Sequence, residues 1–160
     1  MDNDTSAIVK FITFKVADYW FALPMETILK VINCPPLEQG GIVPLGIVQL
    51  GTHTIQLLDL HGVFGLGNIP SPRQLPFLLV LRGANNKLWG ITLESPPDLV
   101  ELSLAAFHSV SVDRRFLPKK QWISHIAMIS GQDGRTLLLL DLKAIFQQET
   151  AQPLDATMAG

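Results

Sequence analysis

The amino-acid sequence predicts an all-β protein in which two small barrels share one core. Three observations favour this fold class. Short apolar runs recur between turns rich in glycine and proline, one pattern of strands occurs twice, and no long amphipathic helix is evident. A chain of 160 residues is long enough for a real core, because it buries roughly 70% of its unfolded surface on folding.

The composition indicates a protein with spare apolar surface and a weak electrostatic field. Hydrophobic residues make up 48% of the chain and charged residues 16%, against a charged fraction of about 25% in a typical soluble domain. We therefore expect some apolar side chains to remain at an interface. The net charge of -2 gives no reason to expect a nucleic acid or an acidic membrane as a partner.

The first expected pair of strands is a hairpin near the N-terminus, after a disordered lead over residues 1–7. Residues 8–16 alternate between apolar and polar side chains, and residues 19–23 return after a very short turn. Pro24 then opens a brief helical or extended passage. Proline and glycine make residues 35–44 a loop.

Two further strands are expected within Gly46–Leu66. The apolar runs 47–50 and 55–60 flank a polar turn, and a short helical piece follows them. Residues 39–58 carry no formal charge and match a membrane span in length, but their polar residues exclude a helix in lipid. We therefore expect buried strands and no direct insertion into a membrane.

The second half of the chain begins with another hairpin. A proline-rich connector over 68–76 precedes expected strands at 77–81 and 88–93. Residues 99–102 form a further candidate strand, and residues 104–112 suit either a helical turn or a loop.

The last expected hairpin surrounds an Asp-Gly pair, which is the strongest short hairpin signal in the sequence. Its strands are expected at 126–129 and 136–140. The polar, alanine-rich residues 147–160 are expected to form a flexible tail.

A repeated pattern links the two halves. Residues 137–146 align with residues 55–64 without a gap, and each copy is an apolar strand that ends in an aspartate, Asp59 or Asp141. An aspartate at this point is expected to cap the following helical turn, because its carboxylate accepts hydrogen bonds from the first backbone N–H groups.

No motif in the sequence predicts catalysis or a bound cofactor. A glycine-rich phosphate loop, a Cys-x-x-Cys pair, a His-Glu-x-x-His helix and a Gly-x-Ser-x-Gly elbow are all absent. The histidines are spread singly, at His53, His61, His108 and His125, whereas a metal site needs three or four ligands. We therefore expect neither an enzyme nor a metal site.

Cysteine usage and the N-terminus both favour the cytoplasm. Cys34 is the only cysteine, which excludes an internal disulfide and suits a reducing compartment. The acidic start Met1–Asp4 is followed by no apolar run, unlike a signal peptide.

One basic and aromatic segment offers an alternative function. These residues could serve a small nucleic-acid-binding barrel. The chain as a whole has no excess of positive charge, so a solvated loop is the better interpretation. The set is Arg114, Arg115, Phe116, Lys119, Lys120 and Trp122.

The order of the motifs along the chain resembles a known family. In sequence, the motifs are the opening hairpin, Gly46-Ile47-Val48-Gln49-Leu50, Leu57-Leu58-Asp59-Leu60, Phe64-Gly65-Leu66, the second hairpin with Trp89-Gly90-Ile91, and Leu139-Leu140-Asp141-Leu142. This order resembles the CheW-like family, whose members couple a CheA-type chemotaxis histidine kinase to methyl-accepting receptors. The resemblance covers residues 8–146 and implies one domain of two intertwined, five-stranded SH3-like barrels with short helical turns, expected at about 8–66 and 77–146.

The resemblance implies a non-enzymatic adaptor in chemotaxis, phototaxis or pilus motility. Its implied partners are the regulatory domain of a CheA-like histidine kinase and the cytoplasmic tip of a methyl-accepting chemoreceptor. A CheW-like assembly scaffold for another complex is the alternative within the same structural class.

The chain departs from the family pattern at the surface that contacts the kinase. Gly51 replaces an arginine that the family associates with productive coupling, and a glycine offers neither its charge nor its forked hydrogen bonds. Gln56 replaces a usual proline, and Lys30 stands where a glutamate is common. The contact residues implied by the family are Ile28, Val31, Gly46, Leu50 and Gly51.

Overall fold

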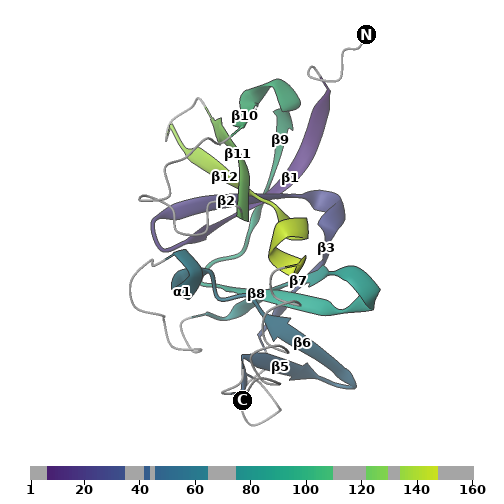
Figure 1. Ribbon diagram of the computed structural model, residues 1–160. Helices are drawn as coiled ribbons and strands as arrows, with labels where there is room; N and C mark the ends of the chain where they lie inside the picture. Colours follow the sequence, from purple (N-terminus) through teal and green to yellow (C-terminus); the bar gives the residue numbers. More distant parts are fainter. Residues whose placement is uncertain are drawn as a thin grey trace.

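The computed structural model confirms the predicted fold class. It describes residues 7–34, 42–43, 46–64, 75–109, 122–129 and 134–147. Within them the chain consists mostly of strands in two sheets, joined by short helical turns (Figure 1). Most of the predicted lead, most of the loop over 35–44 and the predicted tail beyond 147 lie outside this described part.

Each sheet contains six strands. The first sheet, in the upper half of Figure 1, has the order β10-β11-β12-β2-β1-β9. Its strands are β1 (Ile8–Val16), β2 (Tyr19–Pro24), β9 (Asp98–Ser103), β10 (Phe107–Ser109), β11 (Ile123–Met128) and β12 (Thr136–Leu140).

The second sheet lies in the lower half of Figure 1 and has the order β3-β7-β8-β6-β5-β4. Its strands are β3 (Ile28–Asn33), β4 (Ile42–Val43), β5 (Ile47–Leu50), β6 (His53–Leu57), β7 (Phe77–Arg82) and β8 (Leu88–Leu93). The resemblance implied five strands per barrel, whereas the very short strands β4 and β10 bring each sheet to six.

Short helical segments connect the strands. They are η2 (Met25–Thr27), α1 (Leu60–Phe64), η5 (Ala84–Asn86), η6 (Leu104–Ala106) and a helical turn over 142–147. In the part of the chain that the structure describes, none of the helices is long and apolar enough to cross a membrane.

The two halves of the chain exchange their first hairpins. If each strand of the first sheet is replaced by the strand six places away in the chain, so that β1 becomes β7 and β9 becomes β3, the result is the order of the second sheet read in reverse. The topology is therefore a two-fold repeat. The hairpin β1–β2 lies in one sheet with β9–β12, and the hairpin β7–β8 lies in the other with β3–β6. The predicted sub-barrels over 8–66 and 77–146 therefore do not coincide with the sheets, because the strand pairs that join each hairpin to the other half are non-local.

The parallel strand pairs show which residues of the two halves are equivalent. In the first sheet β12 pairs with β2, Leu137 opposite Trp20, and in the second β6 pairs with β8, Ile55 opposite Leu88. This register confirms the predicted alignment of residues 137–146 with residues 55–64.

Both predicted aspartate caps are present. Asp59 Oδ1 accepts a hydrogen bond from the Gly62 backbone N–H at 3.0 Å, and Asp141 Oδ1 accepts one from the Ala144 N–H at 3.2 Å. Each cap ends its strand and starts the helical turn that returns an aromatic side chain, Phe64 or Phe146, to the core.

The core has three parts, one between the sheets and one inside each barrel. The alternation of side chains along β7 shows why both faces are buried, since Leu78 and Val80 point into their barrel while Leu79 and Leu81 join the central cluster. The interior cluster of the first barrel is Phe11, Ala22, Ala127 and Leu137, and that of the second is Val48, Ile55, Leu78 and Val80.

Candidate functional site

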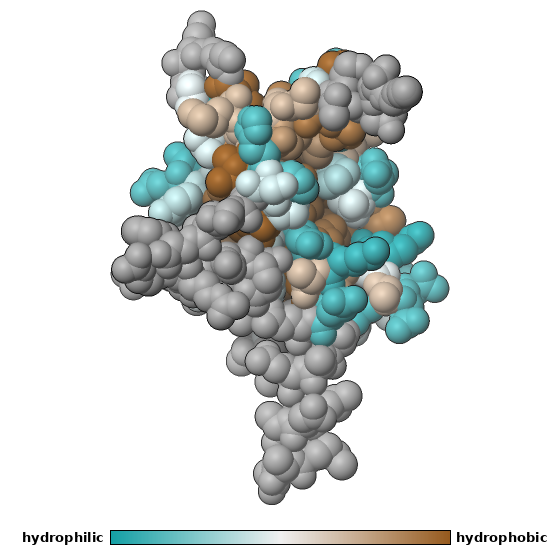
Figure 2. Space-filling model, turned by 45° about the horizontal axis from the view of Figure 1, so that its top comes forward, coloured by the Kyte–Doolittle hydropathy of each residue, from teal (hydrophilic) through white to brown (hydrophobic). Residues whose placement is uncertain are grey.

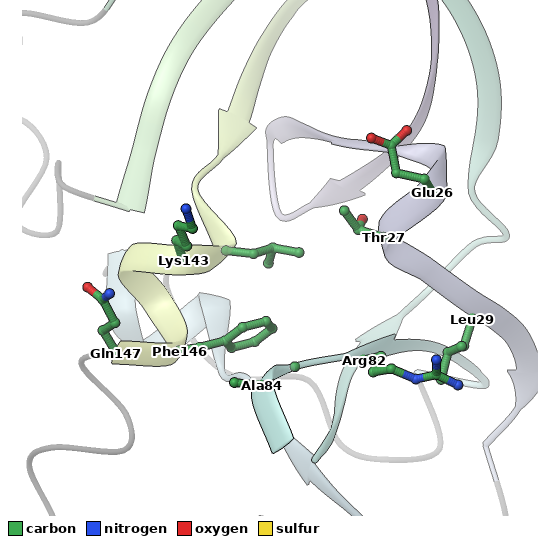
Figure 3. A pocket seen from close by; sticks show the side chains of 10 residues that line it. Glu26, Thr27, Leu29, Arg82, Ala84, Lys143, Phe146 and Gln147 are labelled. Atoms are coloured by element: carbon green, nitrogen blue, oxygen red, sulfur yellow. The ribbon is translucent and has the colours of Figure 1, made fainter. Parts of the chain in front are cut away.

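A groove between the sheets is the first candidate site. It has a volume of about 600 Å³ and lies between the helical turn 142–147 on one side and η2 with the start of β3 on the other. Figure 3 shows Lys143, Phe146 and Gln147 on the first wall and Glu26, Thr27 and Leu29 on the second, with Arg82 and Ala84 below them.

An aromatic stack supports the floor of this groove. The Phe146 ring stacks on Trp89, with ring centroids 5.0 Å apart and planes inclined by 22°. A Cβ atom on Gly83 would lie 2.6 Å from Trp89 Nε1, so only glycine leaves room for the indole here. The helical turn therefore packs on the second sheet at the floor of the groove.

The rim of the groove carries charge of both signs. Glu26 contributes a carboxylate, whereas Arg82 and Lys143 contribute cations. A second cavity of about 310 Å³ shares Thr27 and Lys143 with the groove and extends it toward β12. Thr27 anchors η2 because its hydroxyl donates a 2.8 Å hydrogen bond to the Pro24 carbonyl.

Exposed apolar side chains lie on the strands that end the two sheet orders, and one of them, Leu29, also lines the groove. Leu29 and Val31 on β3 are 41% and 40% exposed, and Leu99 on β9 is 54% exposed. Figure 2 shows such apolar residues interleaved with hydrophilic ones over the upper part of the molecule. The other large exposed hydrophobics among the described residues are Ile8, Tyr19, Met25, Leu104 and Met128. The apolar surface expected from the composition is therefore present.

The predicted contact residues fall into two groups on the second sheet. Ile28 and Val31 lie on β3, which ends the sheet order, whereas Gly46, Leu50 and Gly51 lie on or beside β5. β7, β8 and β6 separate the two groups in the sheet.

Within these groups the side chains differ in exposure. Ile28 packs on the central core and Leu50 on the interior of its barrel, while Val31 and Gly51 are exposed. Gly46 and Gly51 have positive φ angles of 78° and 62°, a conformation that favours glycine. Both glycines therefore have a structural role, whichever partner contacts them.

The residues of the nucleic-acid alternative lie mostly outside the described chain. Trp122 is described, and it is 1% exposed in the central core, with its ring edge-on to Phe64 at 6.2 Å between centroids. A buried indole is not available for stacking on a base, so Trp122 cannot serve the nucleic-acid alternative, whose other aromatic residue, Phe116, lies outside the described residues.

Titratable side chains form no metal cluster in the described ranges. No group of three His, Cys, Asp or Glu residues there is arranged to hold a metal ion. Burial raises the pKa of the Cys34 thiol, so Cys34 is a poorer nucleophile than an exposed cysteine.

Three groove residues had no signal in the sequence. Arg82 directly follows a predicted strand, Lys143 follows the second aspartate cap, and Gln147 was expected to begin the tail. Amphipathic spacing within 142–147 could have extended the helical turn to Gln147, but the approach of this turn to η2 depends on non-local packing.

Comparisons with known proteins agree with this architecture. A model of the CheW-like domain family matches residues 10–150. Among solved structures, the chain is similar to the crystal structure of the scaffolding protein TtCheW from Thermoanaerobacter tengcongensis, with a TM-score of 0.68 and 14% sequence identity. The match covers 85% of this chain and 86% of that chain, and at this identity it shows a shared fold. No curated protein sequence matches the chain.

Proposed function

The chain belongs to the CheW-like domain family, and from that premise we propose that it is a cytoplasmic adaptor that couples a chemoreceptor to a CheA-type histidine kinase. Family membership supports a scaffold role in chemotaxis rather than an enzymatic one. The observation that carries the proposal is the family match over residues 10–150, and the exposed apolar sheet edges and the groove supply the surfaces.

The adaptor would act by geometry. The apolar edge of the second sheet, with Leu29 and Val31, meets the corresponding edge of the kinase regulatory domain. The groove receives a helix of the receptor tip, whose apolar face lies over Phe146 while its polar residues meet the charged rim. A receptor movement that displaces this helix would then be transmitted through the stacked core to the kinase contact.

Gly51 belongs to a second part of the kinase contact in this proposal, at the turn between β5 and β6, which β7, β8 and β6 separate from the β3 edge in the sheet. It lies in the turn between β5 and β6, and no atom lies within 4 Å of the position that its Cβ would occupy. A larger side chain therefore has space, although its backbone would be strained at a φ of 62° by about 1–2 kcal/mol. Restoring the family arginine is therefore feasible and should strengthen kinase binding.

Calorimetry with the regulatory domain of a CheA-like kinase from the same organism tests the proposal. We expect a Kd near 1 μM, which corresponds to about 8 kcal/mol of binding free energy. Gly51→Ala is the matched control for Gly51→Arg, because it imposes the same backbone strain without a guanidinium group.

Two results would decide the matter. Tighter binding by Gly51→Arg than by Gly51→Ala supports a kinase contact at this turn. An absence of heat with both proteins folded would reject kinase coupling and favour the alternative, an assembly scaffold for another complex.

A further inference from the structure

A third hollow lies at the far end of the β7–β8 hairpin, and we call it the hairpin pocket. Its volume is about 390 Å³. One wall is the turn between β5 and β6 with the start of β6, and the other is the turn between β7 and β8; both turns lie at the right of Figure 1. The lining residues are Thr52, His53, Thr54, Arg82, Asn86, Lys87 and Leu88.

The charge of the hairpin pocket is one-sided. Arg82 and Lys87 contribute two cationic side chains, and no described residue that lines the pocket is an aspartate or a glutamate. This contrasts with the whole chain, whose net charge is -2. It also contrasts with the groove, where Glu26 accompanies the cations.

Both cations are held by a well-defined hairpin. Arg82 ends β7 and Lys87 precedes β8, and the turn between them is closed by a 2.7 Å hydrogen bond from the Gly83 N–H to the Lys87 carbonyl. The Lys87 ammonium lies 4.8 Å from the centroid of the buried Trp89 ring, which restricts its position. Little ordering of the Lys87 side chain is therefore needed on binding.

The opposite wall is also fixed. The Thr54 hydroxyl donates to Gln49 Oε1 at 3.1 Å, and Gln49 Nε2 donates to the Gly51 carbonyl at 3.3 Å. These two bonds brace the turn that presents Thr52 and His53 to the pocket.

We propose that the hairpin pocket binds a carboxylate side chain from an acidic segment of a partner protein. A guanidinium beside an ammonium suits a carboxylate, which can accept forked hydrogen bonds from Arg82 and a further bond from Lys87. A nucleic acid is disfavoured because its phosphates need a wide positive field, which a chain of net charge -2 lacks. The proposal goes beyond receptor and kinase coupling, since it assigns a ligand to the pocket itself, although the pocket shares Arg82 with the rim of the groove and adjoins the turn that contains Gly51.

Titration of the full, ¹⁵N-labelled chain with a blocked hexaglutamate peptide tests this proposal. We expect amide shifts concentrated in residues 52–54 and 82–88. Arg82→Gln and Lys87→Gln should each weaken binding about threefold to tenfold, because each removes one partly exposed charged contact. Arg82→Lys keeps the charge and should bind with intermediate affinity, and Lys10→Gln, on β1 in the other sheet, should leave binding unchanged.

The outcomes are distinguishable. Shifts spread over all surface lysines, or affinity unchanged by Arg82→Gln in a folded protein, would overturn the proposal. Inorganic phosphate that binds as tightly at the same amides would indicate a small-anion site and reject an acidic segment. Hexaglutamate binding here without any kinase binding would sustain the hairpin pocket and leave kinase coupling rejected, so the two proposals fail separately.

Discussion

Thr13 places a hydroxyl in the interior of the first barrel, where its counterpart in the second barrel, Val80, places a methyl group. The strand register makes them equivalent, because Phe11 and Leu78 occupy the matching positions two residues earlier. Thr13 is fully buried and its Oγ1 has no hydrogen-bond partner among the described residues. A buried donor without a partner costs stability.

We expect Thr13→Val to raise the free energy of unfolding by about 1 kcal/mol, since it replaces the unpaired hydroxyl with a methyl group of similar volume. Urea denaturation measures the change. Thr27→Val is the matched control, because the Thr27 hydroxyl does donate to Pro24, and its loss should cost about 1 kcal/mol. Destabilisation by both variants would show that Thr13 has a partner in solution.

The raised pKa of Cys34 makes a small part of the stability dependent on pH. Because burial favours the neutral thiol in the folded protein, this contribution is fully present below the unfolded pKa of about 8.5 and is lost as the pH rises through the folded pKa. Urea denaturation between pH 7 and pH 10 should therefore show a smaller loss of stability in Cys34→Ala than in the parent. An equal loss in both proteins would contradict the prediction.

At the scale of elements, the two aspartate caps differ in one neighbour. The position that follows Asp59 by three residues is Gly62, and the equivalent position after Asp141 is Ala144. A Cβ on Gly62 would overlap the Asp59 carboxylate, whereas Ala144 is accommodated beside Asp141. The first cap is therefore tighter than the second.

We expect the effect of Gly62→Ala on the free energy of unfolding to change sign when Asp59 is replaced by alanine. In the parent it should destabilise the protein, because the new methyl group displaces the Asp59 carboxylate. In an Asp59→Ala background, itself weakened by about 1 kcal/mol, it should stabilise α1 through the higher helix propensity of alanine. A double-mutant cycle in urea measures this coupling, and additive effects would refute the overlap.

The sequence predicts the elements well because their signals are local. Strand alternation, the Asp-Gly turn and the aspartate caps all depend on residues within a few positions of one another, and β1, β2, β7 and β8 begin where expected. The sequence did not decide between a helical and an extended passage after Pro24, and the structure contains both, η2 followed by β3. Short segments such as these take their conformation from tertiary packing.

The groove could not be predicted, because its walls come from opposite ends of the chain. Glu26 and Lys143 face each other only after β12 has paired in parallel with β2. Nothing in the local pattern around either residue specifies that pairing. The hairpin pocket has the same origin, since β6 and β8 meet through a parallel pair as well.

At the scale of the whole molecule, the exchange of hairpins makes the two halves of the chain interdependent. The hairpin β1–β2 has β9 and β12 as its neighbours, and both come from the other half. The first half alone would leave this hairpin unpaired on both sides, and the second half alone would leave β7–β8 without β3 and β6. Neither half of the chain can therefore complete a sheet without the other half.

We expect a chain divided within the 68–76 connector to fold only when both fragments are present. Each fragment alone should give no cooperative thermal transition by circular dichroism, and an equimolar mixture should regain one. A break after Asn85, inside the β7–β8 turn, is the control and should reassemble less well because it also opens a hairpin. Independent folding of either fragment would contradict this dependence.

The two-fold repeat also describes an assembly that needs no covalent link between its halves. A half-length chain with the strands of either half could pair all of its strands by exchanging its hairpin with an identical copy. This is the geometry of a closed, domain-swapped homodimer. Gene duplication and fusion of such a homodimer would yield this topology directly. Fusion would also free the two copies to diverge, and the fold now carries Gly62 in one cap and Ala144 in the other, and Thr13 in one barrel and Val80 in its counterpart.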